Sequence, residues 1–194
     1  MNRRHFIQRM AMGGAGLAAA TRAGAYGGAN RHVGDDFPSL ATFDFDTVEL
    51  DAHGRVIARR EHVGRYLRQA VNDDAAIDMI AVPGARFHMG AAAGERKCGA
   101  YECTPRIVRT APMYLSRTPV TQQQWRSVAR LPVVARELAP DPACFSGDEH
   151  PVECVSWFDA AEFCARLTQH TGLAYRLPSE TEWEGACRAG TRTC

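Results

Sequence analysis

The pattern of apolar and polar positions divides the chain into an alternating first half and a second half with helical spacing. Residues 42–50 alternate between apolar and polar side chains, which predicts a strand. Residues 51–54 supply turn chemistry, and residues 55–58 are predicted to form the return strand of a hairpin. Three further runs typical of short strands lie at residues 77–82, 86–90 and 113–117.

Three later segments carry the signature of a helix start. In each, a hydroxyl residue is followed three positions later by an acidic or amide residue, which predicts a capping box. The pairs are Thr121 with Gln124, Ser156 with Asp159, and Ser179 with Glu182. Each cap stabilises its helix by about 1 kcal/mol. Three helices are therefore expected in the second half of the chain.

The middle helix has the clearest apolar face. Its apolar residues recur at intervals of three and four positions: Trp157, Ala160, Ala161, Cys164 and Leu167. We therefore expect Trp157 to be buried, and Cys154 and Cys164 to act as small apolar residues of the core. Gly172 is placed to end the helix in a left-handed conformation.

Strands that precede a few capped helices favour an α+β fold over an alternating α/β sheet. The apolar fraction of 45% and the charged fraction of 23% are ordinary for a globular domain, and 194 residues are enough for one core. No apolar run approaches the roughly 18–20 residues that cross a bilayer, so no stable membrane span is expected.

The N-terminus has the features of an export signal. Arg3, Arg4 and Phe6 precede a weakly apolar stretch, and residues 23–25 fit a small-x-small cleavage site. The pattern resembles a twin-arginine (Tat) signal peptide at residues 1–25, followed by a linker at residues 26–41. It implies the Tat translocase as a partner and a periplasmic or exported protein.

The charge balance argues against nucleic acid as a partner. The chain carries a formal charge of +1, but residues 1–25 hold four arginines and no acid. The remainder therefore carries a formal charge of −3, without the basic footprint that nucleic-acid binding requires.

Three sequence blocks carry the most specific information in the chain. Residues 80–90 read IAVPGARFHMG, residues 118–125 read TPVTQQQW, and residues 150–184 contain PVECVSW and RLPSETEWE. Their order and spacing resemble the formylglycine-generating enzyme, or sulfatase-modifying factor, family, in which the first block is an opening hairpin. The resemblance implies that residues 77–194 form the N-terminal half of that domain, with a strand-rich extension at residues 42–76.

The resemblance implies a truncated, irregular α+β fold of the C-type-lectin-like kind. The family-motif residues of the third block are Trp157, Asp159, Arg176, Leu177, Pro178, Glu180, Glu182, Trp183 and Glu184. Two of these carboxylates would suit acid–base chemistry. The spacing of Ser179 and Glu182 instead favours a capping role, so we interpret these residues as structural.

Members of this family oxidise a cysteine of a sulfatase to formylglycine with O₂, using copper bound by a cysteine pair; calcium is a further candidate cofactor. No position in the chain matches that pair. We therefore assign no catalytic, cofactor-binding or metal-binding residue, and we expect the 194-residue polypeptide alone to be inactive. A sulfatase or another protein is the implied partner.

Two alternatives to this oxidoreductase remain. One is a non-catalytic binding module on the same lectin-like fold, since fold alone does not decide function. The other is the iron-dependent sulfoxide synthase branch of the family, which adds a helical bundle. Residues 26–76 are too short and too strand-like for that bundle.

Seven cysteines in an exported chain indicate disulfides, and the odd number leaves at least one of them unmatched within the chain. Cys98 and Cys103 are candidates for a loop disulfide, with free thiols as the alternative. In secreted relatives, cysteines at places resembling Cys164 and Cys187 bond to the C-terminal half of the domain. A zinc site is not expected, because no paired histidine or C-x-x-C completes four ligands.

Overall fold

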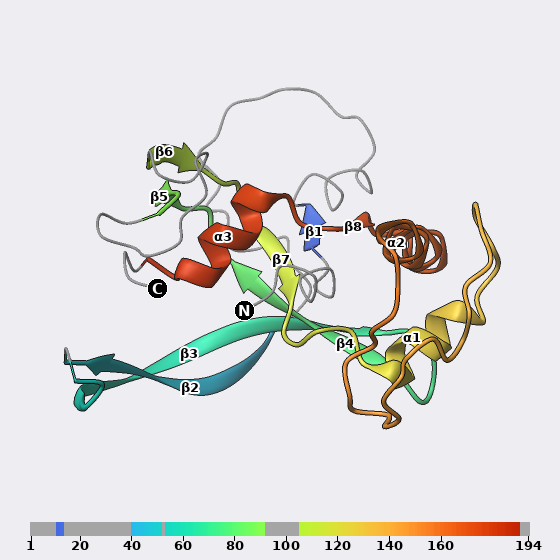
Figure 1. Cartoon of the computed structure of the whole chain (residues 1–194), viewed down its shortest axis with the longest axis horizontal. Helices are drawn as coiled ribbons and strands as arrows, with labels where there is room; N and C mark the ends of the chain where they lie inside the picture. The colour runs from blue at the N-terminus through green and yellow to red at the C-terminus, as the bar shows by residue number, and fades with distance from the viewer. Residues whose placement is uncertain (1–10, 14–39, 52, 92–104, 191–194) are drawn as a thin grey trace.

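A computed structural model of the chain describes residues 11–13, 40–51, 53–91 and 105–190 (Figure 1). The strands of these residues are β1 (Ala11–Gly13), β2 (Ala41–Leu50), β3 (Val56–Ala70), β4 (Ala76–Val82), β5 (Arg86–Met89), β6 (Arg106–Arg109), β7 (Met113–Ser116) and β8 (Tyr175–Arg176). The helices are α1 (Gln122–Ala129), α2 (Trp157–Thr171) and α3 (Glu180–Arg188). The predicted mixture of sheet and helix is confirmed.

The strands form two antiparallel sheets. One has the order β2-β3-β4-β7-β1-β8, and the other pairs β5 with β6. β3 runs for 15 residues, far beyond the predicted return strand, because residues 56–66 pair with β2 and residues 66–70 pair with β4. The turn end of this hairpin projects away from the helices (Figure 1).

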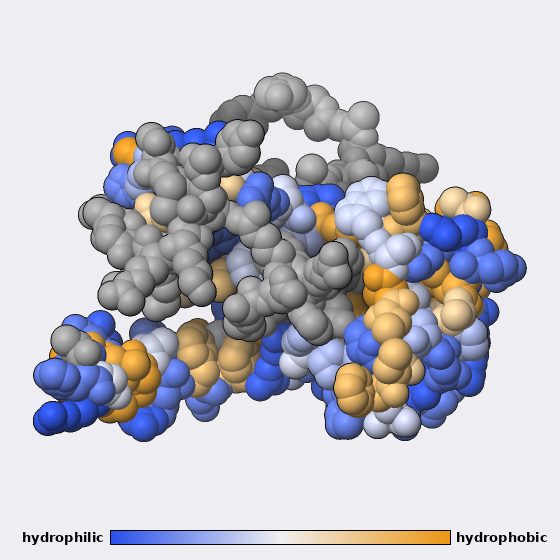
Figure 2. Space-filling view, viewed as in Figure 1, coloured by the Kyte–Doolittle hydropathy of each residue, from blue (hydrophilic) through white to orange (hydrophobic). Residues whose placement is uncertain are grey.

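The projecting hairpin carries apolar as well as charged side chains. Val48, Leu50, Val56 and Ile57 are exposed there, and orange atoms mark the tip of the hairpin in Figure 2. Asp51 fixes the turn, since its Oδ1 accepts the backbone N–H groups two and four residues later at 2.8 and 2.9 Å. The predicted hairpin is therefore confirmed, with longer strands than the sequence indicated.

One strand lies within the segment that the sequence indicates to be a signal peptide. β1 pairs with β7 on one side and with β8 on the other. The proposed export residues Arg3, Arg4 and Phe6 lie outside the described residues, as do Cys98 and Cys103.

The first motif block does not form the hairpin that the family resemblance implies. β4 pairs with β3 and β7, whereas β5 pairs with β6 in the other sheet. The cause lies at the connection, where Ala85 accepts the Thr110 N–H at 2.9 Å and donates its own N–H to the Thr110 hydroxyl at 3.1 Å. A Cβ on Gly84 would lie 2.7 Å from the Thr110 carbonyl oxygen, so this close approach requires glycine.

All three predicted capping boxes are present. Thr121, Ser156 and Ser179 each accept the backbone N–H of the residue three positions later, and the side chain of that residue binds back to the capping residue. Gly172 ends α2 with φ of 73°, in the predicted left-handed conformation. No helix of the described segments is long and apolar enough to cross a membrane.

The main core lies between the sheet and helices α1 and α2. Ile77 and Met79 of β4 pack there with residues of both helices. Trp125 stacks on Phe163 with ring centroids 5.2 Å apart, and its indole N–H donates to the Ala139 carbonyl at 2.8 Å. Trp125 therefore links α1 to α2 and to the loop that follows α1.

Of three residues predicted to be buried in the core, the structure confirms one, and the prediction is wrong for the other two. Cys164 is buried at 3% exposure, as predicted. Trp157 is 55% exposed, because the first turn of α2 extends past the core and its ring packs edge-on against Phe158 instead. Cys154 is also exposed, because the chain turns it outward between the inward-facing Val152 and Val155.

A buried ion pair joins α2 to the irregular segment that follows α1. Arg166 and Glu162, with side chains 0% and 1% exposed, are joined at 2.7 Å. Their other partners include backbone groups of the segment: the carbonyl oxygens of Ala129, Leu131 and Arg136, and the N–H groups of Val134 and Ala135. Burial alone would raise the pKa of Glu162, but Arg166 and the two N–H groups hold that pKa below its ordinary value.

We predict that Arg166→Ala lowers the free energy of unfolding by about 3–5 kcal/mol, because it leaves the Glu162 carboxylate buried without its partner. The matched control is Arg59→Ala, which removes a pair with Asp46 from an arginine side chain that is 62% exposed. That change should cost about 0–1 kcal/mol. Denaturant unfolding measures both, and equal losses would contradict the prediction.

Candidate functional site

The third motif block builds a rigid entry to helix α3. The guanidinium of Arg176 donates two hydrogen bonds to the carboxylate of Glu182, at 2.6 and 2.7 Å. The same carboxylate accepts the N–H of Ser179 at 2.8 Å. Glu182 therefore serves as a cap and as the partner of Arg176, which confirms the predicted capping arrangement.

A second carboxylate of the motif joins blocks that lie far apart in the sequence. Glu184 accepts the N–H of Gly90, at the end of the first block, at 2.8 Å, and the Nε–H of Arg188 at the same distance. Arg188 also donates to the Gly90 carbonyl at 2.6 Å. The helix approaches β5 so closely that a Cβ on Gly185 would lie 2.8 Å from the Phe87 ring.

The other motif residues complete this framework. Leu177 packs against the main core, and Pro178 precedes the cap of α3. Asp159 caps α2 and lies 3.3 Å from Arg136. Glu180 is exposed and Trp183 is half-buried.

Of the cysteines predicted to form disulfides, the structure describes Cys164 and Cys187, and these two lie in different surroundings. Cys164 is buried in α2, and burial raises the pKa of its thiol to about 12. Cys187 is exposed on α3, and both are free thiols. The structure does not pair them with each other, and the implied bonds to another part of the domain stay a prediction.

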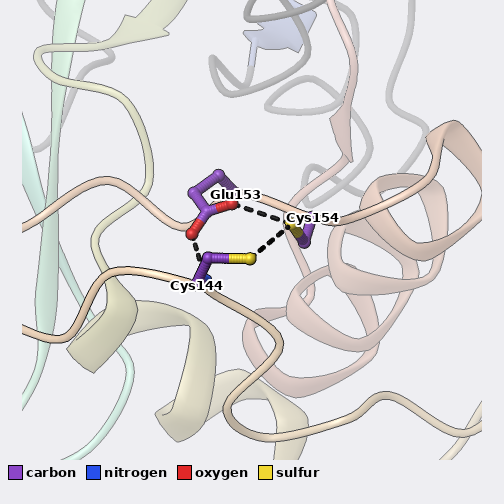
Figure 3. Close-up of side chains that lie close together, drawn as sticks. All are labelled: Cys144, Glu153 and Cys154. Carbon is purple, nitrogen blue, oxygen red and sulfur yellow. Dashed lines mark hydrogen bonds between the residues drawn. The ribbon is translucent and has the colours of Figure 1, made fainter.

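The structure brings together a thiol cluster that the sequence analysis missed (Figure 3). The sulfur atoms of Cys144 and Cys154 are 3.4 Å apart, and the Cys154 thiol donates to Oε2 of Glu153 at 2.8 Å. Oε1 of Glu153 accepts the backbone N–H groups of Cys144 and Phe145, the latter at 3.1 Å. One carboxylate thus holds both cysteine segments side by side.

The cluster has donor atoms that are suitable for metal binding or for thiol chemistry. One ligand atom from each of Cys144, Glu153 and Cys154 lies within 4.8 Å of the others. The hydrogen bond to Glu153, followed by that to Cys144, raises the pKa of Cys154 to about 12. These hydrogen bonds therefore favour the protonated thiol of Cys154 over the thiolate in the resting protein.

The backbone at this cluster has an unusual conformation. Cys154 has φ of 58°, in the left-handed region that residues other than glycine seldom adopt. Such strain needs support from its surroundings. The Glu153 hydrogen bonds and the buried Val152 supply that support here.

Comparison with known proteins identifies the family. A family profile described as the sulfatase-modifying factor enzyme 1-like domain matches residues 67–193, which is more than half of the chain. The chain therefore belongs to this family, and the prediction from the three motif blocks is confirmed.

Individual relatives match over shorter stretches. The chain is similar to the formylglycine-generating enzymes of Mus musculus and Bos taurus, at 36% identity over 83 residues, which cover 43% of this chain and 18% and 17% of those enzymes. It is also similar to the Chaperone protein LppX of Paenibacillus barcinonensis, at 29% identity over 44% of this chain and 39% of that protein. The matched part thus spans less than half the length of each relative. No solved structure gives a significant match.

We predict that Glu182→Gln changes how stability depends on pH. Hydrogen bonds from Arg176 lower the pKa of Glu182 from 4.5 to about 2, so the ionised group stabilises the fold above pH 4.5. This contribution is lost as the pH falls from 4.5 toward 2. The free energy of unfolding should therefore fall more steeply over that range in the wild type than in the variant.

The matched control for this pH series is Glu180→Gln, at an exposed position of the same helical turn. Its unfolding free energy should follow the wild-type curve. Parallel curves for wild type and Glu182→Gln would contradict the role given to Glu182.

Proposed function

We propose that this chain is part of a formylglycine-generating protein, which oxidises a cysteine of a sulfatase to formylglycine with O₂. The match of residues 67–193 to the family profile carries the proposal, and the likeness to the mouse and cattle enzymes supports it. In this proposal the described residues act as a framework. The Glu184–Gly90 and Arg176–Glu182 contacts hold the motif blocks in place for a reaction centre built elsewhere in the domain.

Copper is the cofactor that the family resemblance implies, and the described cysteines do not fit a copper–thiolate pair. Cys164 is buried and Cys187 is exposed on another helix. Cys144 and Cys154 are adjacent, but Glu153 holds the Cys154 proton and so opposes the thiolate form. We therefore derive no step through copper on these residues.

We predict that the 194-residue polypeptide, incubated with a sulfatase-derived cysteine peptide, copper and O₂, leaves the peptide unchanged. The natural protein that carries this chain should convert the peptide thiol to an aldehyde. Mass spectrometry detects the change, and a hydrazide probe labels the new aldehyde. The same incubation without O₂ is the control.

Each outcome of that experiment bears on the proposal. Failure of the natural protein to form aldehyde in the presence of copper and O₂ would contradict the function. Aldehyde formed by the 194-residue polypeptide would confirm the function and contradict the framework role.

A second candidate function is assistance in the folding of another polypeptide. The likeness to Chaperone protein LppX favours it. The two functions differ in one readout. A folding assistant would raise the refolding yield of a denatured partner whose target cysteine has been replaced, whereas an oxidase requires that cysteine.

We also propose that the protein is exported through the Tat route, on the strength of Arg3, Arg4 and Phe6. We predict that the double change Arg3→Lys and Arg4→Lys retains the protein in the cytoplasm, because the paired arginines form the recognised part of the signal. Cell fractionation followed by immunoblotting measures this, with Arg22→Lys as the matched control. Unchanged export of the double variant would contradict the proposal.

A further inference from the structure

We propose that Cys144 and Cys154 form a disulfide that closes the loop of residues 144–154. The pairing rests on the juxtaposition of the two thiols in the fold and is independent of the proposed function. It assigns a covalent modification to two cysteines that lie outside the predicted disulfide set.

The two sulfur atoms need only a small movement to bond. They are 3.4 Å apart, and a disulfide bond is about 2.05 Å long, so the gap to close is about 1.4 Å. Both cysteines are exposed, which leaves their side chains free to rotate and leaves the sulfurs accessible to an oxidant. Figure 3 shows the two side chains pointing toward each other across adjacent segments.

The loop is held in place by contacts with the start of α1, so that the cysteines meet before any bond forms. Gln122 is buried, and its side chain donates to the Phe145 carbonyl at 2.5 Å and accepts the Gly147 N–H at 3.2 Å. At the other end, Val152 donates its N–H to the Val120 carbonyl at 2.9 Å. These anchors raise the effective concentration of one thiol at the other.

A disulfide fits the donor set better than a metal ion does. Both carboxylate oxygens of Glu153 already accept hydrogen bonds, Oε1 from two backbone N–H groups and Oε2 from the Cys154 thiol. Two sulfurs then remain, whereas a structural zinc site uses four protein ligands. In the described part of the chain, no fourth ligand residue joins the group. A disulfide also places no additional negative charge beside Glu153.

The oxidant we name is a small-molecule disulfide, with oxidised glutathione as the probe. The Cys144 thiolate attacks one sulfur of glutathione disulfide, so a mixed disulfide forms and the first glutathione leaves, taking the proton that Cys144 lost. Cys154 then attacks the Cys144 sulfur and releases the second glutathione. Two protein thiols are oxidised, and one glutathione disulfide is reduced to two thiols.

Glu153 has a defined part in the second step. Its Oε2 lies 2.8 Å from the Cys154 sulfur and accepts the thiol proton as the sulfur attacks. The proton then passes to the departing glutathione. Glu153 therefore positions the two cysteine segments and receives the proton, while the fold itself supplies the proximity of the sulfurs.

The test is to incubate the 194-residue chain with oxidised and reduced glutathione, block free thiols, and map the disulfides without reduction. Trypsin releases residues 137–166 as one peptide, which holds Cys144, Cys154 and Cys164. A glutamate-specific protease then cuts after Glu149 and Glu153, both between the first two cysteines, and after Glu162, which separates Cys164. We expect the fragments that carry Cys144 and Cys154 to stay joined until a reductant is added, with Cys164 alkylated only after unfolding.

Two variants distinguish the contribution of the nearby thiols from that of proton transfer to Glu153. Cys154→Ser should leave Cys144 as a mixed disulfide with glutathione. Glu153→Gln keeps the oxygen that accepts the backbone N–H groups but loses the proton acceptor, so ring closure should slow by about tenfold or more and the mixed disulfide should accumulate. An unchanged closure rate in Glu153→Gln would overturn the role of Glu153.

Three results would overturn the pairing itself. The first is that both cysteines can still be alkylated in the folded, oxidised chain. The second is that one of them bonds to a different cysteine. The third is that one equivalent of Zn²⁺ binds, blocks oxidation, and is released by Cys144→Ser, which would assign a metal site instead.

Discussion

The buried pair of Arg166 and Glu162 is the interaction on which the described part of this domain most depends. A guanidinium without exposed surface is tolerated only when its N–H groups and its charge are matched. Here the partners are a carboxylate of the same helix and the backbone of the segment that follows α1. The irregular segment that follows α1 therefore has several of its backbone N–H and carbonyl groups hydrogen-bonded to buried side chains. It leads directly into the loop that carries Cys144.

The family motifs acquire a physical meaning in this framework. Glu184 binds the Gly90 backbone across 94 positions of sequence, and Arg176 holds the cap of the same helix. These contacts fix where the motif blocks lie relative to one another. The motif carboxylates, which would also suit acid–base chemistry, therefore have a structural role here. The proposed oxidase function would place the reactive thiols on this framework.

The sequence predicted the local features well and the long-range ones poorly. Capping boxes and the Gly172 terminus depend on neighbours within four residues, so their spacing was sufficient. The exposure of Trp157 depends on where the core ends along α2, which periodicity does not encode. The partner of β5 depends on a contact with Thr110, 25 residues from Ala85. Glu162 and Arg166 have the spacing of an ordinary surface pair, and only the backbone groups around them explain their burial.

The sequence analysis missed the thiol cluster for the same reason. Cys144 and Cys154 lie ten positions apart in the sequence, and the contacts that bring them together come from α1.

The most direct test of the account is hydrogen exchange at the Val134 and Ala135 amides, which donate to Glu162. If the buried pair orders this segment, both amides exchange as slowly as those within α2, and Glu162→Gln accelerates them while leaving the β3–β4 amides protected. Exchange at the rate of an unstructured loop in the wild type would contradict the account.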